Sequence, residues 1–245
     1  MDLGIRGRTA LVTAGSKGLG FGSALALAEE GCNVVISARG EEALRAAEER
    51  LIGAGAQVLA IAADVTDPAT PARLVEATAE RFGSIDIVVA NAGGPPPARS
   101  LDLDDDAIFK ALNDNFVTSA RLVRHAVPHM RSLGWGRIAC ITSSSIKEPI
   151  PTLSASNTAR TALWAWAKTA ASDLAAEGIT LNLVCPGLHD TDRMRQLGYT
   201  GGSGAIRAGH PHDFGKIVAF LCSDAAAFVT GSTVLVDGGA AHGLV

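Results

Sequence analysis

The sequence predicts an α/β protein built on one doubly wound parallel sheet. Seven short runs of apolar and β-branched residues recur along the chain, and helix-length segments rich in Ala, Leu and Glu separate them. Short continuous apolar runs are typical of strands that are buried on both faces. Because crossovers between such strands are right-handed, this alternation leaves few topologies other than a parallel sheet with helices on both sides.

The expected strands are justified one by one by their composition. In order they read TALVT, NVVISA, QVLAIA, IDIVVA, RIACIT, TLNLV and TVLV, at residues 9–13, 33–38, 57–62, 85–90, 137–142, 180–184 and 233–236. Two breaks interrupt the pattern, the Gly-Gly-Pro-Pro-Pro run at 93–97 and the Gly-rich stretch at 198–204. Both fall where a doubly wound sheet opens its ligand crevice.

Composition limits the classes of function. With 245 residues, 47% of them hydrophobic and 19% charged, the chain suffices for one domain with a large core. The net charge of −4 excludes a broad nucleic-acid footprint, and no apolar run or leader suggests a membrane or secretion. We therefore expect a cytoplasmic protein without a metal site. Four separated cysteines are expected to be core residues: Cys32, Cys140, Cys185 and Cys222.

Seven ordered motifs carry a resemblance to a known family. The glycine turn at 12–20 (VTAGSKGLG) is followed by Asp64-Val65, the Asn-Ala-Gly run at 91–93, Asn115, Ser143, Pro186-Gly187 with Thr191, and the VDGG run at 236–239. Their spacing resembles that of the short-chain dehydrogenase/reductase family, and particularly its 3-oxoacyl carrier-protein reductases. The resemblance covers most of the chain and implies a single Rossmann-fold domain over residues 1–245.

The glycine turn predicts a binding site for a dinucleotide. Gly15 and Gly18 would let backbone approach a pyrophosphate, and a helix beginning near Leu19 would offer it unpaired N–H groups. Ala14 stands where relatives carry the first Gly, which we expect to be tolerated only with φ below zero. An ordinary strand–helix turn is the alternative interpretation.

The resemblance also implies which residues contact the cofactor. Carried over position by position, they are Gly15, Ser16, Lys17, Gly18, Leu19, Gly20, Arg39, Asp64, Val65, Asn91, Ala92, Gly93, Arg160, Pro186, Gly187 and Thr191.

Two cations and one absence favour NADP over NAD. The second strand ends in ISAR and lacks the acidic residue that would bind a ribose 2′-hydroxyl. Lys17 and Arg39 lie where NADP-preferring relatives place basic residues. Solvated surface charges are the alternative interpretation of both.

Counting from Ser143 gives an unusual catalytic set. In typical relatives a Tyr follows this Ser by about 13 positions and a Lys follows the Tyr by four; here these positions hold Ser156 and Arg160. The GITLN segment at 178–182 aligns without a gap in this register. A rival register, with Leu153 and Asn157 at these positions, needs a deletion and an insertion, and we reject it.

This substitution removes the usual acid. A phenol of pKa ~10 can be tuned to exchange a proton, whereas a serine hydroxyl is too weak an acid alone and can only pass a proton along a chain. Arg160 would act as a fixed cation that holds the cofactor ribose or stabilises an alkoxide. Asn115 and Ser143 match the rest of the family's tetrad, so the predicted catalytic residues are Asn115, Ser143, Ser156 and Arg160.

Other groups are candidate proton donors or substrate contacts. His189 leads them, because imidazole titrates near neutrality; a surface histidine is the alternative. Lys147, Glu148 and Tyr199, the one tyrosine of the chain, follow. Tyr199 belongs to a short, Gly-rich substrate lid expected near residues 188–208.

The helix after Ser156 predicts an oligomer. Trp164, Trp166 and Leu163 make two of its faces bulky and apolar, and in relatives this helix packs against its copy in another subunit. We expect a homotetramer or a homodimer. Core packing would explain only one of the two faces.

The sequence therefore predicts an NADP-dependent oxidoreductase that reduces a small carbonyl compound or oxidises an alcohol with a divergent site. Intact Asn115, Ser143 and Thr191 favour the enzyme. The missing Tyr and Lys favour an inactive dinucleotide-binding sensor or scaffold. A third alternative is a lyase-like enzyme that uses the nucleotide structurally.

Overall fold

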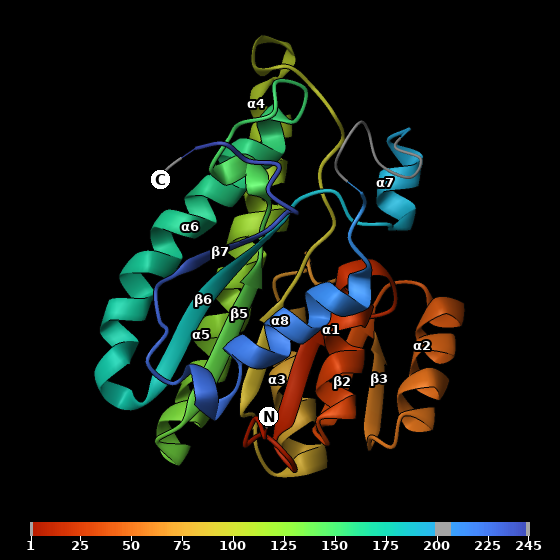
Figure 1. Ribbon diagram of the computed structural model, residues 1–245, viewed down its shortest axis with the longest axis vertical. Coiled ribbons are helices and arrows are strands. Elements are labelled where there is room, and N and C mark those ends of the chain that lie inside the picture. Colours follow the sequence, from red (N-terminus) through yellow and green to blue (C-terminus); the bar gives the residue numbers. More distant parts are fainter. Residues whose placement is uncertain (1, 199–206, 244–245) are drawn as a thin grey trace.

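The computed structural model describes residues 2–198 and 207–243, and they form one parallel seven-stranded sheet (Figure 1). The strand order is β3-β2-β1-β4-β5-β6-β7, so the predicted doubly wound α/β architecture is confirmed. All six strand pairings are parallel. The strands are β1 (Thr9–Thr13), β2 (Asn33–Ala38), β3 (Val58–Ala62), β4 (Ile87–Ala90), β5 (Gly136–Ile141), β6 (Ile179–Pro186) and β7 (Thr233–Val236).

Helices cover both faces of the sheet. One face packs against α1 (Gly18–Glu29), α2 (Glu41–Gly53) and α8 (Pro211–Leu221). The other packs against α3 (Thr70–Phe82), α5 (Thr118–Leu133) and α6 (Ser154–Leu174). Two short helices, α4 (Asp105–Ala111) and α7 (Asp192–Gln196), lie beyond the carboxyl ends of the strands at the top of Figure 1. Single turns complete the set: η1 (Ser100–Asp102), η3 (Ser144–Ile146), η4 (Ala175–Glu177) and η5 (Asp224–Ala226).

Helices α1 and α8 cross at a point where two glycines replace side chains. A Cβ built on Gly22 would overlap the carbonyl oxygen of Pro211, and one built on Gly215 would overlap the carbonyl oxygen of Gly22. Backbone therefore packs against backbone at this crossing. Helix α1, which follows the glycine turn, is held in place by α8.

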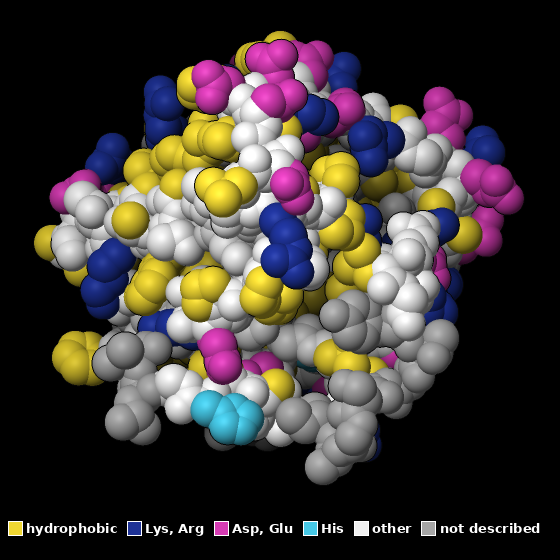
Figure 2. All heavy atoms as spheres, turned by 90° about the horizontal axis from the view of Figure 1, so that it is seen from above, with side chains coloured by type: hydrophobic (Ala, Val, Ile, Leu, Met, Phe, Trp, Pro, Cys, Tyr) yellow, Lys and Arg dark blue, Asp and Glu magenta, His cyan; other side chains and the backbone are white. Residues whose placement is uncertain are grey.

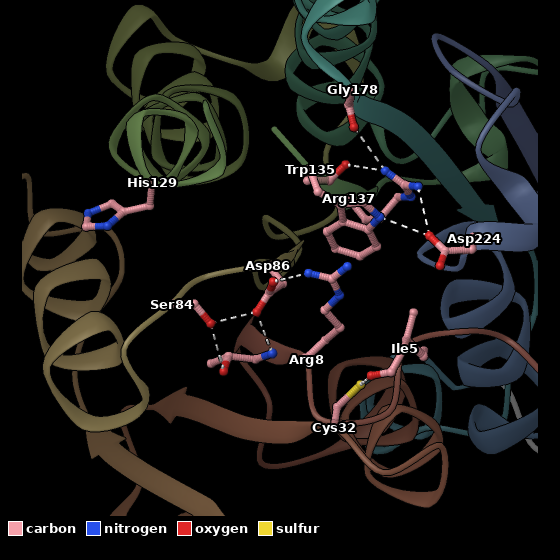
Figure 3. Close-up of polar contacts among 12 residues, drawn as sticks. Ile5, Arg8, Cys32, Ser84, Asp86, His129, Trp135, Arg137, Gly178 and Asp224 are labelled. Atoms are coloured by element: carbon pink, nitrogen blue, oxygen red, sulfur yellow. Dashed lines mark hydrogen bonds and ion pairs between the residues drawn. The ribbon is translucent and has the colours of Figure 1, made fainter. Parts of the chain in front are cut away.

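A cluster of charged and aromatic side chains ties together the amino ends of the strands (Figure 3). The Trp135 ring lies between two guanidinium groups, with Arg8 Cζ 3.9 Å and Arg137 Cζ 4.2 Å from its centroid. Asp86 accepts a hydrogen bond from Arg8 at 2.9 Å, and Asp224 accepts one from the Trp135 indole at 2.9 Å. This amino-end cluster links segments from five parts of the chain, and it lies at the edge opposite to the glycine turn.

Arg137 is the buried member of this cluster, at 3% exposure. Its guanidinium donates to the carbonyl oxygens of Gly136, Gly178 and Ser223 and pairs with Asp224 at 3.3 Å. Burial lowers the pKa of Arg137, and the Asp224 carboxylate counteracts the effect. The arginine thus supplies donors to three backbone carbonyls at this end of the sheet.

The four cysteines are buried and unpaired, as predicted. Burial raises the pKa of Cys140 to about 12, so this thiol stays protonated and unreactive at neutral pH. In the described part of the chain, no helix combines the length and the apolar character that crossing a membrane requires.

Candidate functional site

The carboxyl ends of β1, β4, β5 and β6 border a cavity of about 310 Å³, which we call the central cavity. Because all strands run in parallel, the residues that follow them gather at this one edge of the sheet. Seen from above this edge, the surface has hollows bordered by hydrophobic side chains, and charged side chains lie between them and around the rim (Figure 2).

The central cavity collects most of the predicted catalytic and nicotinamide-side residues. Of the predicted set, its lining contains Lys17, Gly18, Leu19, Asn91, Ala92, Gly93, Ser143, Ser156, Arg160, Pro186, Gly187 and Thr191.

A second cavity, here the β2-side cavity, continues past the glycine turn. It collects the predicted residues Ser16, Lys17, Arg39, Asp64, Val65, Ala92 and Gly93. Arg39 is 79% exposed and lies 3.9 Å from Asp64. A hydrogen bond from the Thr66 backbone N–H, with a smaller contribution from Arg39, holds the pKa of Asp64 below its usual value. The Arg39 guanidinium is thus held loosely enough to turn toward a phosphate.

The glycine turn leaves the first turn of α1 open to an anion. The N-cap residue Lys17 makes no side-chain cap hydrogen bond, and the first turn contains no acidic residue. Gly18, at φ +55°, sits on the cavity wall, where a side chain would meet Thr191. Helix N–H groups without a cap are the groups that bind phosphate in dinucleotide sites. The residues present therefore fit a pyrophosphate.

Two predicted glycines of this turn lie behind the cavity wall. A Cβ on Gly15 would lie 2.9 Å from Ile36 on β2, and one on Gly20 would overlap the carbonyl oxygen of Ala14. Neither residue lines either cavity. Gly15 therefore packs the turn against β2, and the close approach of its backbone to a pyrophosphate stays a prediction.

The expected conformation of Ala14 is wrong. Its φ is +46°, whereas we expected φ below zero, and it is the one described non-glycine residue with positive φ. The turn needs a left-handed residue here whichever side chain it carries. An L-residue in that region costs about 1–2 kcal/mol, which the surrounding contacts offset.

We expect Ala14→Gly to raise the free energy of unfolding by about 0.5–1 kcal/mol, because relief of the left-handed strain exceeds the entropy that glycine loses on folding. Urea denaturation measures it. Ala54→Gly is the matched control, because Ala54 caps α2 at φ −82°, where glycine relieves nothing and should destabilise. Equal destabilisation by both changes would contradict the strain at Ala14.

Arg160 lines the central cavity. It projects from α6 and is 8% exposed. Its Nη1 donates to the carbonyl oxygen of Ile141 at 3.0 Å and its Nη2 makes a longer contact, 3.5 Å, with that of Ala92. Burial, with a smaller contribution from Arg193, lowers the pKa of Arg160 to about 10, so the guanidinium remains a cation at neutral pH.

Ser156 and Ser143 present hydroxyl groups to the same cavity. Ser156 lies one helical turn before Arg160 and is 7% exposed. The Ser143 hydroxyl, after β5, accepts a hydrogen bond from the Ser145 N–H at 3.1 Å, which leaves its own proton free to be donated. The structure thus brings Ser143, Ser156 and Arg160 together in one cavity.

Asn115 does not line the central cavity, although its chain neighbours Ala111 and Asp114 line the β2-side cavity. It is 2% exposed and lies in a π-helical turn, η2 (Leu112–Val117), between α4 and α5. Its Nδ2 donates to the carbonyl oxygen of Ala111 at 3.3 Å, and its buried Oδ1 has no partner among the described residues. Isolated π-turns occur frequently at functional sites. The Oδ1 atom is available to accept a hydrogen bond from a bound water.

His189 is held more firmly than a mobile surface histidine. It is 4% exposed, with Nδ1 3.2 Å from the carbonyl oxygen of Gly187 and its ring edge-on to Phe214. Its other edge faces Gly209, where a Cβ would lie 2.8 Å from Nε2. Burial lowers the pKa of His189, so the imidazole is neutral near pH 7. It lines the central cavity, and its Nδ1 is engaged by the Gly187 carbonyl oxygen.

The remaining candidate donors lie elsewhere. Lys147 stacks over the Trp164 ring at 4.2 Å, and the Glu148 carboxylate accepts a hydrogen bond from the His242 N–H. Neither lines the central cavity. Tyr199 and part of the expected lid lie outside the described residues, so the lid near 188–208 stays a prediction.

The apolar faces of α6 are partly covered within the chain. Leu163 is fully buried, and Trp166 packs near Phe116 with ring centroids 6.4 Å apart. The Lys147 ammonium group lies over the ring of Trp164. The dimer or tetramer expected from these faces stays a prediction.

Arg193 is a cavity residue that the sequence analysis missed. It projects from α7, lines the central cavity and donates through Nη2 to the carbonyl oxygen of Pro95 at 2.7 Å. Its place two positions after Thr191 was the one signal that could have found it.

Comparison with known proteins agrees with this geometry. A family model described as Enoyl-(Acyl carrier protein) reductase matches residues 13–241. Dehydrogenase/reductase SDR family member 4 of Homo sapiens is 34% identical over 241 residues, which cover 95% of this chain and 87% of the relative. The chain belongs to the short-chain dehydrogenase/reductase family.

Two further relatives are named for the compound on which they act. Cis-4-hydroxycyclohexanecarboxylate dehydrogenase of Sinomonas cyclohexanicum is 34% identical, over 95% of this chain and 96% of its own length. The L-sorbose reductase of Gluconobacter frateurii, solved with NADPH and L-sorbose, superposes with a TM-score of 0.91 at 30% identity and covers 98% of each chain.

Proposed function

We propose that this protein is an NADP-dependent oxidoreductase that interconverts a carbonyl compound and its alcohol through a divergent catalytic site. The observation that carries the proposal is the central cavity, in which Ser143, Ser156 and Arg160 share one space with Gly18 and Thr191. The family's oxidoreductases support it. The chemistry supplied by a bound nicotinamide would be hydride transfer to or from the substrate carbon.

Two cations support the preference for NADP. Lys17 and Arg39 both line the β2-side cavity, and β2 ends without a carboxylate. The G. frateurii relative, which binds NADPH, is in keeping with this choice. An arginine is well suited to hold a ribose 2′-phosphate in two hydrogen bonds.

We expect NADPH to bind at least tenfold more tightly than NADH, because only NADPH carries the 2′-phosphate. Lys17→Ala and Arg39→Ala should each weaken NADPH binding and leave NADH binding unchanged. Fluorescence titration of both nucleotides measures this. Arg45→Ala, on the exposed side of α2 and outside the β2-side cavity, is the control. Equal affinities that neither change alters would overturn the preference.

In the proposed site, the hydroxyls of Ser143 and Ser156 donate hydrogen bonds to the substrate oxygen. Arg160, a fixed cation at neutral pH, stabilises negative charge as that oxygen becomes an alkoxide. Neither a serine hydroxyl nor the Arg160 guanidinium releases a proton near neutral pH. The proton therefore comes from water and passes along the Ser156 hydroxyl. The Oδ1 of Asn115 orients that water. In this assignment Ser156 and Arg160 replace the family's Tyr and Lys.

We expect Ser156→Ala to lower turnover at least tenfold. The measurement is NADPH oxidation at saturating cofactor across a panel of ketones, aldehydes and 3-oxo thioesters. Ser154→Ala is the matched control, because the Ser154 hydroxyl pairs with Ser100 at 2.8 Å and does not line the central cavity. Turnover that survives in the Ser156 variant would remove this residue from the relay.

The absence of a phenol in the central cavity, among the residues described, favours one alternative function, a dinucleotide-binding sensor. That alternative predicts tight NADPH binding with no turnover of any carbonyl in the panel.

A further inference from the structure

The central cavity holds two guanidinium groups and little compensating negative charge. Arg160 projects from α6 and Arg193 from α7, and both line the cavity. Burial, with a smaller contribution from Arg193, lowers the pKa of Arg160. The hydrogen bonds that each makes within the described chain go to uncharged carbonyl oxygens.

The one carboxylate among the described lining residues of the cavity is otherwise engaged. Asp192 lines the cavity, but it pairs with Arg195 at 2.9 Å, outside the cavity. No ion pair within residues 2–198 and 207–243 involves Arg160 or Arg193. Charges that leave water are normally paired, because an isolated charge is costly to desolvate. Arg160, at 8% exposure, is such a charge, and Arg193 is a half-buried cation in the same cavity, so we expect a ligand to bring the compensating negative charge.

Arg193 is already oriented to receive such a partner. Its bond to Pro95 holds the guanidinium alongside Gly94, which also lines the cavity and where a Cβ would lie 3.8 Å from both Nε and Nη2. One N–H of Nη2 is thereby used, and the other donors of the planar fork remain for an anion. A carboxylate is the group that fits this fork with two parallel hydrogen bonds.

We propose that the substrate carries a carboxylate, and that Arg193 binds it while Arg160 faces the reacting oxygen. This inference rests on the function proposed above and narrows its substrate class to oxo and hydroxy acids. The S. cyclohexanicum relative, named for a hydroxycyclohexanecarboxylate, is in keeping with it.

The first test measures binding and does not depend on turnover. Calorimetry with cyclohexanecarboxylate and with the uncharged cyclohexanecarboxamide is carried out on the full chain, with and without saturating NADP⁺. We expect the carboxylate to bind at least tenfold more tightly than the amide, and Arg193→Gln to abolish that ratio. Arg193→Lys should restore part of it. Arg124→Gln, at an exposed cation on α5 that lines neither cavity and makes no ion pair among the described residues, should leave it unchanged and is the control.

The second test separates this inference from the proposed function. It compares the turnover of 4-oxocyclohexanecarboxylate with that of its amide. Arg193→Gln should raise KM for the carboxylate at least tenfold and leave its kcat nearly unaltered. Both constants for the amide should stay nearly the same. Absence of turnover with a preserved carboxylate preference in binding would overturn the proposed function alone. Equal binding of acid and amide, or an Arg193→Gln change that weakens NADPH instead, would overturn the inference, the latter by assigning Arg193 to a cofactor phosphate.

Discussion

Gly22→Ala is expected to lower the free energy of unfolding by about 3 kcal/mol or more. The added methyl would overlap the backbone carbonyl of Pro211, which cannot rotate away as a side chain would. Helices α1 and α8 would have to separate along their crossing. Because α1 offers its N-terminus to the central cavity, nucleotide binding should weaken together with stability.

Urea denaturation measures the loss of stability, and titration with NADPH measures the loss of nucleotide affinity. Gly53→Ala is the matched control, because Gly53 lies in α2 with no atom within 4 Å of its built Cβ. That change should be neutral or stabilise by up to ~1 kcal/mol, since alanine favours helix. Gly215→Ala probes the same crossing from α8 and should reproduce the loss. Wild-type stability in both crossing variants would mean that the helices do not approach as closely as described.

Arg160→Met is expected to lower carbonyl turnover at least tenfold and to leave the thermal midpoint unchanged or slightly raised. Methionine fills much of the space of the arginine stem but removes the cation that we place at the reacting oxygen. Replacing a desolvated, unpaired charge by an apolar side chain is often neutral or stabilising. Loss of activity without loss of stability marks a residue kept for chemistry. Calorimetric scanning and NADPH oxidation measure the pair of effects.

Arg137→Met provides the contrast, because Arg137 is buried to a similar degree in the amino-end cluster. It pairs with Asp224 and serves three carbonyl oxygens, so its removal should destabilise by about 2–4 kcal/mol and spare NADPH affinity. If Arg160→Met instead destabilises as strongly as Arg137→Met, Arg160 is a structural residue and its proposed role is wrong.

The strands were predictable because apolar runs buried on both faces leave a strong signal. Thr9–Thr13, Asn33–Ala38 and Thr233–Val236 match at both ends. The fourth strand begins two residues later than expected, at Ile87, and the Asp86 side chain just before it accepts hydrogen bonds from Thr9 N–H and Ser84. Boundaries depend on such tertiary hydrogen bonds, which hydrophobic pattern does not encode.

The site was predictable where motifs follow strands. Ser143, Ser156 and Thr191 meet in one cavity because parallel strands deliver their successors to one edge. The left-handed Ala14 was not predictable from a residue type that normally avoids positive φ. Arg193 was missed because its significance lies in a hydrogen bond to Pro95, almost a hundred residues away in sequence.

The amino-end cluster has a consequence for how this protein tolerates change. Its ion pairs and stacked guanidiniums lie at one end of strands of five to six residues, and the central cavity lies at the other. Strands of that length separate the two ends by roughly 17–20 Å, a distance at which the free-energy effects of substitutions normally add. Stability that is lost through substitutions at the cavity can therefore be restored by substitutions in the amino-end cluster. The new substrate preference would not change.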